Sequence, residues 1–367
     1  MTKAAELAKM GEVLTNSQIG GRRNIVFNGA MQVAQRGTSS TGLGATDGYY
    51  TVDRFGLNFS GTASRLTMTQ TADGPSGFAN CLKLDCTTAD TSIAAAEYIQ
   101  LHYRIEGQDL QQLKKGTSDA EKITISFYVK GNASATYTCE IEDVDNNRYN
   151  SQEFSVTTSW TKVTLTYNAD TTGVLGNDNG QSMAINFWLH VGSNFTSGTH
   201  TDNVWHTTAT QRVGDNQTSF ADSTDRTFFI TGVQMEVGSQ ATPFESRSFG
   251  EELSLCQRYC QVRIGSESSN GTNSQLGYGN ARSSTQAFFQ DRLQVKMRTP
   301  PSLTVVSPTN FYLYQTSAIA TTALAIDISD VNTMMLVATV SGGLTSPTFH
   351  TLGTNNATAQ VIYSAEL

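Results

Sequence analysis

Residues 228–261 read FFITGVQMEVGSQATPFESRSFGEELSLCQRYCQ, and they contain the change of pattern that decides the fold. Apolar residues first alternate with polar ones, which predicts a strand that closes a β-domain. Pro243 then favours a turn, and Ser248 with Glu251 three residues later forms a capping box for a helix. We therefore expect a β-domain to end here and a short helix to follow over residues 249–262.

The same period of two recurs upstream of this stretch. Runs at residues 123–130, 162–167 and 185–191 each have one apolar and one polar face, which is typical of antiparallel sheets packed on one side. Many short strands separated by turns predict a β-sandwich or jelly roll. The turn-rich segments lie at residues 72–79, 143–150, 173–180 and 214–225.

The 367-residue chain is therefore expected to be mainly β and to have four parts. Residues 1–23 form an N-terminal attachment segment whose short amphipathic helix docks on a partner, or else is a frayed tail. Residues 24–246 form the large jelly roll, residues 247–264 the connecting helix, and residues 265–367 a smaller C-terminal β-domain that begins with a flexible loop. Strands of that last domain are expected at residues 287–295, 302–306, 333–340 and 360–363.

Composition argues against several classes of partner. Only 15% of residues are charged and the net charge is −8 without a basic block, which does not favour nucleic-acid binding. No apolar run has the length of a membrane span, and the N-terminus has no signal-peptide core. The five cysteines are an odd number at irregular spacing, which indicates buried reduced thiols and synthesis in a reducing cytoplasm.

The sequence contains no recognisable catalytic, nucleotide-binding or metal-binding motif. We therefore expect no catalytic, cofactor or metal site and no enzymatic activity. Asp143, Asp145 and Asn147 alternate as in a calcium loop, but the required glycine and glutamate are missing, which favours a hairpin turn. Cys256 and Cys260 share one face of the expected helix, yet a metal site would need two further soft ligands.

One group of side chains suits a glycan. Asn186, Trp188 and His190 lie on the polar face of the strand at residues 185–191, and Trp205 with His206 could extend that face. An exposed indole covers the apolar face of a sugar ring, while amide and imidazole groups bind its hydroxyls. The alternative is that Trp188 packs under a loop or at a subunit interface. If Trp188→Ala folds and binds glycan unchanged, the receptor site lies elsewhere, for example on the C-terminal domain.

A further set of motifs carries a family resemblance over residues 24–262. The motifs are NIVFNGAMQ (24–32), QRGTS (35–39), YTVDRF (50–55), IEGQDL (105–110), FYVK (127–130), TGVQME (231–236), ATPFE (241–245) and CQRY (256–259). With them the chain resembles a family of virion proteins of tailed bacteriophages, chiefly tail-fibre and appendage proteins of marine and cyanophage type. The resemblance implies a jelly roll like that of carbohydrate-binding modules. Many such modules hold a structural calcium through acidic residues of the first and last strands, where this chain has Thr231 and Gly232.

The resemblance also implies a function. We expect a structural virion protein, assembled in the host cytoplasm, that serves as a tail fibre or fibre-like appendage and contributes to attachment to host-surface glycan. The alternative is a capsid decoration or head-fibre protein, and a polysaccharide depolymerase is disfavoured because no β-helix period is present. Expected partners are other virion proteins, contacted through residues 1–23, and two sister subunits in a homotrimer. Apolar runs at residues 311–313 and 334–337 are expected to be exposed and to pack in that assembly.

Overall fold

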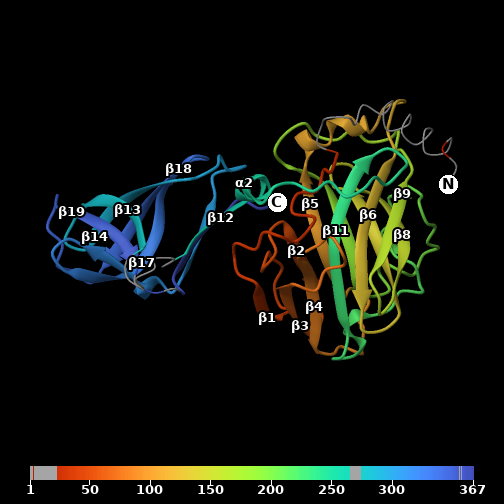
Figure 1. Ribbon diagram of the computed structural model, residues 1–367, viewed down its shortest axis with the longest axis horizontal. Helices are drawn as coiled ribbons and strands as arrows, with labels where there is room; N and C mark the ends of the chain where they lie inside the picture. The colour runs from red at the N-terminus through yellow and green to blue at the C-terminus, as the bar shows by residue number, and fades with distance from the viewer. Residues whose placement is uncertain (1–2, 4–22, 265–273, 355, 357) are drawn as a thin grey trace. The chain divides into compact units, whose positions relative to one another are not determined.

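The computed structural model describes residue 3 and residues 23–264, 274–354, 356 and 358–367. It confirms a mainly β chain, which divides into two compact units, Met1–Glu252 with Leu367 and Leu253–Glu366 (Figure 1). Apart from Lys3, the expected N-terminal helix lies outside the described residues, as does the loop expected at residues 265–273. Among the described helices, none combines the length and apolarity needed to cross a lipid bilayer.

The first unit is a sandwich of two antiparallel sheets (Figure 1). One sheet has the order β1 (Ser39–Leu43), β3 (Arg65–Thr71), β4 (Cys81–Thr88), β11 (Thr227–Val237), β6 (Ile123–Gly131) and β9 (Thr161–Tyr167). The other has the order β2 (Phe55–Ser60), β5 (Tyr98–Glu106), β10 (Gln181–Val191), β7 (Ala135–Asp143) and β8 (Arg148–Val156). Short 3-10 helices lie in the connections: η1 (Gly107–Asp109), η2 (Gln111–Leu113), η3 (Ala209–Gln211) and η4 (Phe220–Asp222). The strands predicted from alternation are confirmed as β6, β9, β10 and β11.

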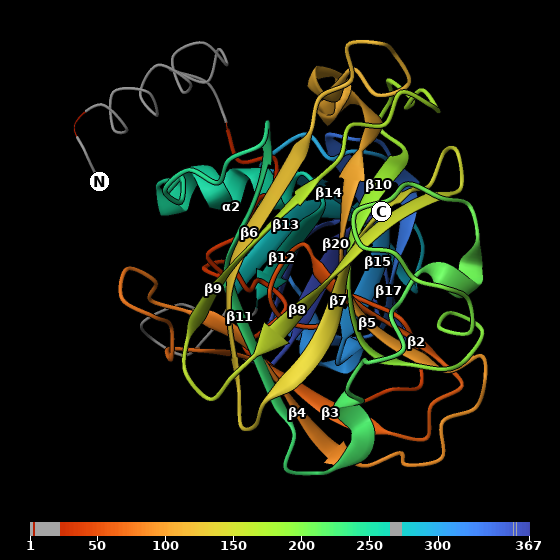
Figure 2. The ribbon, with the colours of Figure 1, turned by 90° about the vertical axis from the view of Figure 1, so that its right-hand side faces the viewer.

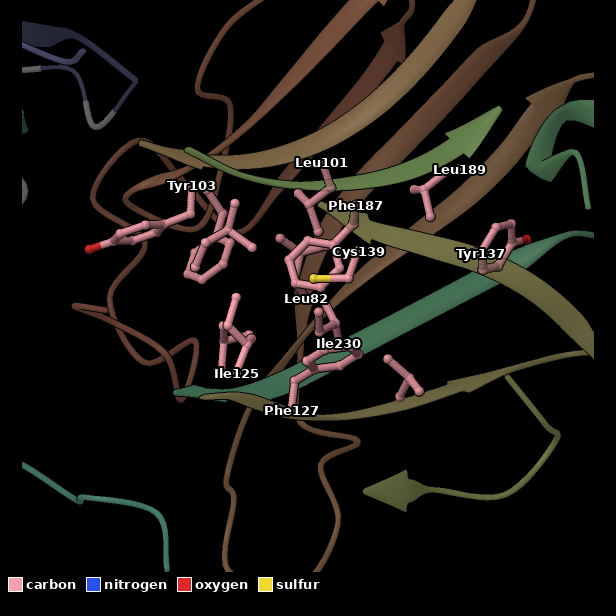
Figure 3. Packing of buried hydrophobic residues seen from close by; sticks show 14 of the residues in the cluster. Leu82, Leu101, Tyr103, Ile125, Phe127, Tyr137, Cys139, Phe187, Leu189 and Ile230 are labelled. Atoms are coloured by element: carbon pink, nitrogen blue, oxygen red, sulfur yellow. The ribbon is translucent and has the colours of Figure 1, made fainter. Parts of the chain in front are cut away.

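The core of this unit lies between the two sheets. Figure 3 shows side chains of β5, β10 and β7 pointing toward those of β6 and β11. Phe187 of β10 and Phe127 of β6 meet edge to face with ring centroids 5.1 Å apart. Because the apolar residues of each strand recur every second position, one face of each sheet supplies this core. The opposite face is left polar.

Two of the motifs quoted above, NIVFNGAMQ (24–32) and TGVQME (231–236), pair with each other. The first half of β11 bonds to β4, but after an irregularity between Thr231 and Gln234 its second half bonds to residues 25–29 instead. Ile25 N–H donates to Met235 O (2.9 Å), and Val233 N–H donates to Gly29 O (2.9 Å). A Cβ on Gly29 would lie 2.0 Å from Val233 O, so only glycine fits there. Two motifs that are about two hundred residues apart in the chain therefore lie side by side in the same sheet.

The connecting helix is shorter than predicted. Helix α2 (Phe249–Gln257) begins after Ser248, whose Oγ accepts from Glu251 N–H at 3.3 Å, so the predicted cap is confirmed. The predicted extension to residue 262 is wrong, because strand β12 (Cys260–Ile264) begins there and pairs with β20 (Gln360–Ser364). Strand pairing prevails over the helical spacing of the apolar residues.

All five cysteines are buried thiols that form no disulfide. Cys256 lies in α2 but Cys260 lies in β12, so the expectation that they share one helix face is wrong. Cys81 and Cys86 belong to β4 and Cys139 belongs to β7. Burial of the thiols is confirmed.

The second unit combines a closed barrel with a small sheet. The barrel order is β13 (Ser274–Ala281), β14 (Gln286–Arg292), β18 (Thr333–Val340), β17 (Ala318–Ser329), β16 (Phe311–Tyr314) and β19 (Phe349–Thr354), closing on β13. The sheet order is β12, β20 and β15 (Ser302–Val306), and η5 (Pro308–Asn310) precedes β16. The strands predicted near β14, β15, β18 and β20 are confirmed.

The apolar runs of this unit are not exposed as expected. Phe311 and Leu313 of β16, and Met334 and Leu336 of β18, are buried in the barrel core. The residues between them are half-buried on the outer side. Period-two alternation along each strand explains the difference, because half of each run points inward. These runs therefore give no support to an oligomer.

Candidate functional site

Three of the five predicted glycan-binding residues lie on the outer face of the five-stranded sheet, but they are covered. Asn186, Trp188 and His190 point away from the core that Ile185 and Phe187 enter, as the alternation predicted. Their exposed fractions are nevertheless only 2%, 1% and 0%, so the expectation of an exposed Trp188 is wrong. The alternative, that Trp188 packs under a loop, agrees with the structure.

Residues 192–222 lie over these three side chains, and we call them the covering segment. It connects β10 toward β11 and is drawn in yellow-green to green at the right of Figure 2. The Phe195 ring packs 5.0 Å from the indole of Trp188, and the Arg212 guanidinium lies 5.0 Å from the same ring. Gln217 Nε2 donates to Trp188 O at 2.7 Å. Aromatic, cation–π and hydrogen-bond contacts thus hold the segment over the sheet.

A buried charge network lies beneath the covering segment. Arg212 donates from Nε and Nη2 to the two oxygens of Glu140, both at 2.7 Å. Glu140 also accepts from Trp188 Nε1 and Asn186 Nδ2, each at 3.1 Å. Burial lowers the pKa of Arg212, but Glu140 and Glu142 outweigh that effect and raise it, so the guanidinium stays charged. The polar groups that could bind a sugar are therefore occupied by one another.

Glu142 gives a pH-dependent prediction. Burial raises the pKa of Glu142 and the Glu140 carboxylate adds to this, against the opposing effect of Arg212. The folded state then binds the proton more tightly than the unfolded chain, so ionised Glu142 costs stability above an unfolded-state pKa of about 4.3. We expect Glu142→Gln to raise the free energy of unfolding at pH 7 and to give no gain below that pKa, as measured by urea unfolding. Glu121→Gln serves as the control, because the Glu121 carboxylate is 40% exposed and already paired with Lys114 at 3.0 Å. An equal gain at both pH values would contradict this explanation.

Trp205 and His206 do not join the indole of Trp188. Trp205 Nε1 donates to Asn168 O at 2.7 Å, and the ring packs against the sandwich core. His206 exchanges two backbone hydrogen bonds with Tyr149, at 2.8 and 3.0 Å, and burial lowers the pKa of its imidazole. Both residues fix the covering segment to the edge of the sheet.

The segment that resembled a calcium loop is a hairpin turn. Asp143 ends β7 and pairs with Arg148 at the start of β8, which confirms the predicted hairpin. Lys115 Nζ forms a buried ion pair with the Asp143 carboxylate and lies 3.0 Å from Asp170. A lysine thus occupies the position that a cation would need.

An exposed aromatic pair on the barrel was missed by the sequence analysis. Tyr278 of β13 and Phe349 of β19 are each 57% exposed, and their rings stack with centroids 5.9 Å apart and an interplanar angle of 17°. Tyr278 stands between Gly277 and Gly279, and a Cβ on Gly279 would lie 1.6 Å from Phe288 O. An aromatic residue flanked by glycines in a strand was the available signal, because alternation places its ring on the face opposite to the two glycine positions.

Polar side chains surround this pair. Gln290 lies opposite Tyr278 in the β13–β14 ladder, and Asn280 lies opposite Phe349 in the β13–β19 ladder. Gln290, Asn280 and the aromatic pair all face outward, and Gln290 also lines a shallow depression beside Tyr278. We call Tyr278, Asn280, Gln290 and Phe349 the barrel platform. Flat apolar rings edged by amides can stack on a sugar ring and bind its hydroxyls.

Comparisons with known proteins identify no family. Neither the scan against family models nor the search of curated proteins finds a match. Among solved structures, a CBM4 structure is 14% identical with a TM-score of 0.33, over 57% of this chain and 97% of the other. A family 11 carbohydrate-binding module from Clostridium thermocellum, in complex with a mixed-linked tetrasaccharide, is 12% identical with a TM-score of 0.28, over 56% and 98%. The enzymatically active domain of bacteriophage CBA120 tailspike protein 4 is 13% identical with a TM-score of 0.28, over 58% and 21%. These values are low, and neither fold nor function is inferred from them.

Proposed function

We propose that the chain is a non-enzymatic structural protein of a tailed-bacteriophage particle, a tail fibre or fibre-like appendage, that binds host-surface glycan. The virion assignment is supported by the motif resemblance over residues 24–262. Those motifs are structural in this fold, since residues 25–29 complete the sheet beside β11. The observation that carries glycan binding is the exposed, stacked pair of Tyr278 and Phe349 on the barrel.

The barrel platform fits this role better than the sandwich face does. On the sandwich, Glu140 and Asn186 already bind Arg212, Trp188 and each other. On the barrel, two aromatic faces are open to solvent. A pocket that binds sugars combines such apolar surface with a few polar groups that fix orientation.

A single platform would bind weakly. Aromatic stacking contributes about 1 kcal/mol beyond area burial, so a single site has a Kd on the order of millimolar. In the proposed homotrimer three platforms act together, and the effective concentration of the second and third sites raises the avidity. Weak single sites are thus compatible with firm attachment.

Removing the aromatic pair tests the binding site. We expect the double variant Tyr278→Ala with Phe349→Ala to weaken binding to host-surface polysaccharide by on the order of tenfold, since the stacking surface is lost. Binding is measured on immobilised polysaccharide with the purified full chain. The matched control is Ile328→Ala on β17, which is 63% exposed and lies diametrically opposite β13 in the barrel order.

Three outcomes would contradict the assignment. Unchanged binding in the folded double variant would place the site elsewhere. A changed oligomeric mass would make the platform a subunit contact. Polysaccharide that becomes shorter during incubation with the wild-type protein would indicate a depolymerase instead.

The place on the particle needs a separate experiment. Microscopy of purified particles is expected to locate a few copies at the tail. Many copies on the head would favour the alternative, a capsid decoration or head-fibre protein, and absence from mature particles would exclude both.

A further inference from the structure

Three titratable side chains meet in a buried group that is separate from the Arg212–Glu140 network. Asp90 follows β4, Glu97 directly precedes β5, and His190 lies near the end of β10. One potential ligand atom from each lies within 4.8 Å of the others. The exposed fractions are 7%, 8% and 0%. We call these residues the histidine–carboxylate cluster.

His190 points an unpartnered nitrogen at this cluster. Its Nδ1 lies 2.7 Å from Ser219 Oγ, whereas Nε2 is buried without a hydrogen-bond partner among the described residues and lies 3.7 Å from Glu97 Oε2. Burial lowers the pKa of His190, although both carboxylates act in the opposite direction. A buried polar atom without a partner is unfavourable, and a neutral imidazole nitrogen is a common metal ligand.

The two carboxylates are held in place by hydrogen bonds. Asp90 Oδ2 accepts from Ala63 N–H (2.7 Å) and Thr62 Oγ1 (3.0 Å), and Glu97 Oε2 accepts from Ala94 N–H (2.9 Å). Within the described part of the chain, neither carboxylate forms an ion pair with a lysine or arginine. Buried negative charge therefore lacks a cationic partner.

We propose that Asp90, Glu97 and His190 bind a divalent first-row transition metal ion, with Zn²⁺ as the best match. One imidazole nitrogen and two carboxylate oxygens are ligands that Zn²⁺ accepts, with water in a fourth, tetrahedral position. Bond lengths of about 2.0–2.1 Å place tetrahedral ligands about 3.4 Å apart. The separation of His190 Nε2 and Glu97 Oε2 is close to that value. Ca²⁺ fits less well because it requires six to eight oxygen ligands.

The ion would join parts of the sandwich that are distant in sequence. Asp90 N–H donates to Ala221 O, and Gly192 N–H donates to Glu97 O, both at 2.8 Å. The connection between β4 and β5, the end of β10 and the turn at Ser219 therefore converge on the site. An ion that binds only the folded state stabilises that state in proportion to its occupancy. Ser219 would act as a positioning residue that holds the His190 ring through Nδ1.

The test begins with the full chain after metal removal by a chelator. Titration with Zn²⁺ in a calorimeter is expected to show one equivalent bound per chain, and thermal unfolding should shift upward with added Zn²⁺. Glu97→Gln and His190→Gln should each weaken Zn²⁺ binding by more than about tenfold, and Ser219→Ala by about 10–100-fold. The matched control is His102→Gln, because His102 is a buried histidine of the neighbouring strand β5 that lies outside the cluster.

A spectroscopic arm keeps the test decisive if a variant does not fold. Co²⁺ bound to the wild-type protein should give the visible bands of a four-coordinate nitrogen–oxygen site, without a thiolate charge-transfer band. No saturable binding by the wild type would overturn the proposal. So would a thiolate band, which points to the cysteines, or unchanged binding by folded Glu97→Gln and His190→Gln.

Discussion

Arg212→Ala is expected to lower the free energy of unfolding of the sandwich by about 3–5 kcal/mol. The substitution leaves the fully buried Glu140 carboxylate without the guanidinium that binds both its oxygens. It also removes the planar group stacked on Tyr149 at 3.9 Å and on Trp188 at 5.0 Å. Because Trp160, Trp188 and Trp205 are the three tryptophans and all lie in the first unit, tryptophan fluorescence during urea unfolding reports on that unit alone.

A double variant separates charge from packing. Arg212→Met combined with Glu140→Gln removes both charges and keeps side chains of similar size, so much of the lost stability should return. Arg226→Ala is the control, since Arg226 forms a comparable two-bond pair with Asp222 at 2.6 Å, but that carboxylate is half-exposed. If Arg212→Ala and Arg226→Ala lower the free energy of unfolding equally, burial of the Arg212–Glu140 pair is not what stabilises the covering segment.

Trp188→Ala is expected to destabilise the sandwich by about 3–5 kcal/mol, the usual cost of removing a buried tryptophan. The indole is 1% exposed and contacts Tyr98, Phe195 and Arg212. The same urea experiment measures this loss, with Trp160 and Trp205 remaining as reporters. Trp160→Ala, at a half-buried loop position, should cost clearly less. A fully stable Trp188→Ala protein with reduced glycan binding would contradict the buried position and restore the exposed-indole hypothesis.

Local alternation predicted strands such as β6 and β10 closely because each has one face in the core and one face toward polar groups. It could not predict what covers the polar face of β10. Arg212 and Phe195 lie in a connection without regular alternation, and their contacts with Trp188 follow from tertiary packing. In the same way, Val262 fits a helical stripe, but pairing of β12 with β20, about a hundred residues away, makes its segment extended.

The site chemistry was predictable only in part. Alternation placed Asn186, Trp188 and His190 on one face correctly, yet the partners of His190 in the cluster come from the connection before β5. Asp90 and Glu97 are separated from His190 by about a hundred residues and belong to no recognisable metal motif. Tyr278 and Phe349 are likewise joined only by the barrel ladder. Proximity of this kind arises from topology rather than from spacing.

The buried thiols make the chain a convenient substrate for site-directed labelling. Burial raises the pKa of Cys81 to about 11 and that of Cys139 to about 12, so their reactive thiolate forms are scarce at neutral pH. Because all five native cysteines are also inaccessible, a maleimide dye should attach selectively to a single cysteine introduced on the surface. Native thiols would then react only when the protein around them unfolds. The rate of that slow reaction would measure how often each unit unfolds.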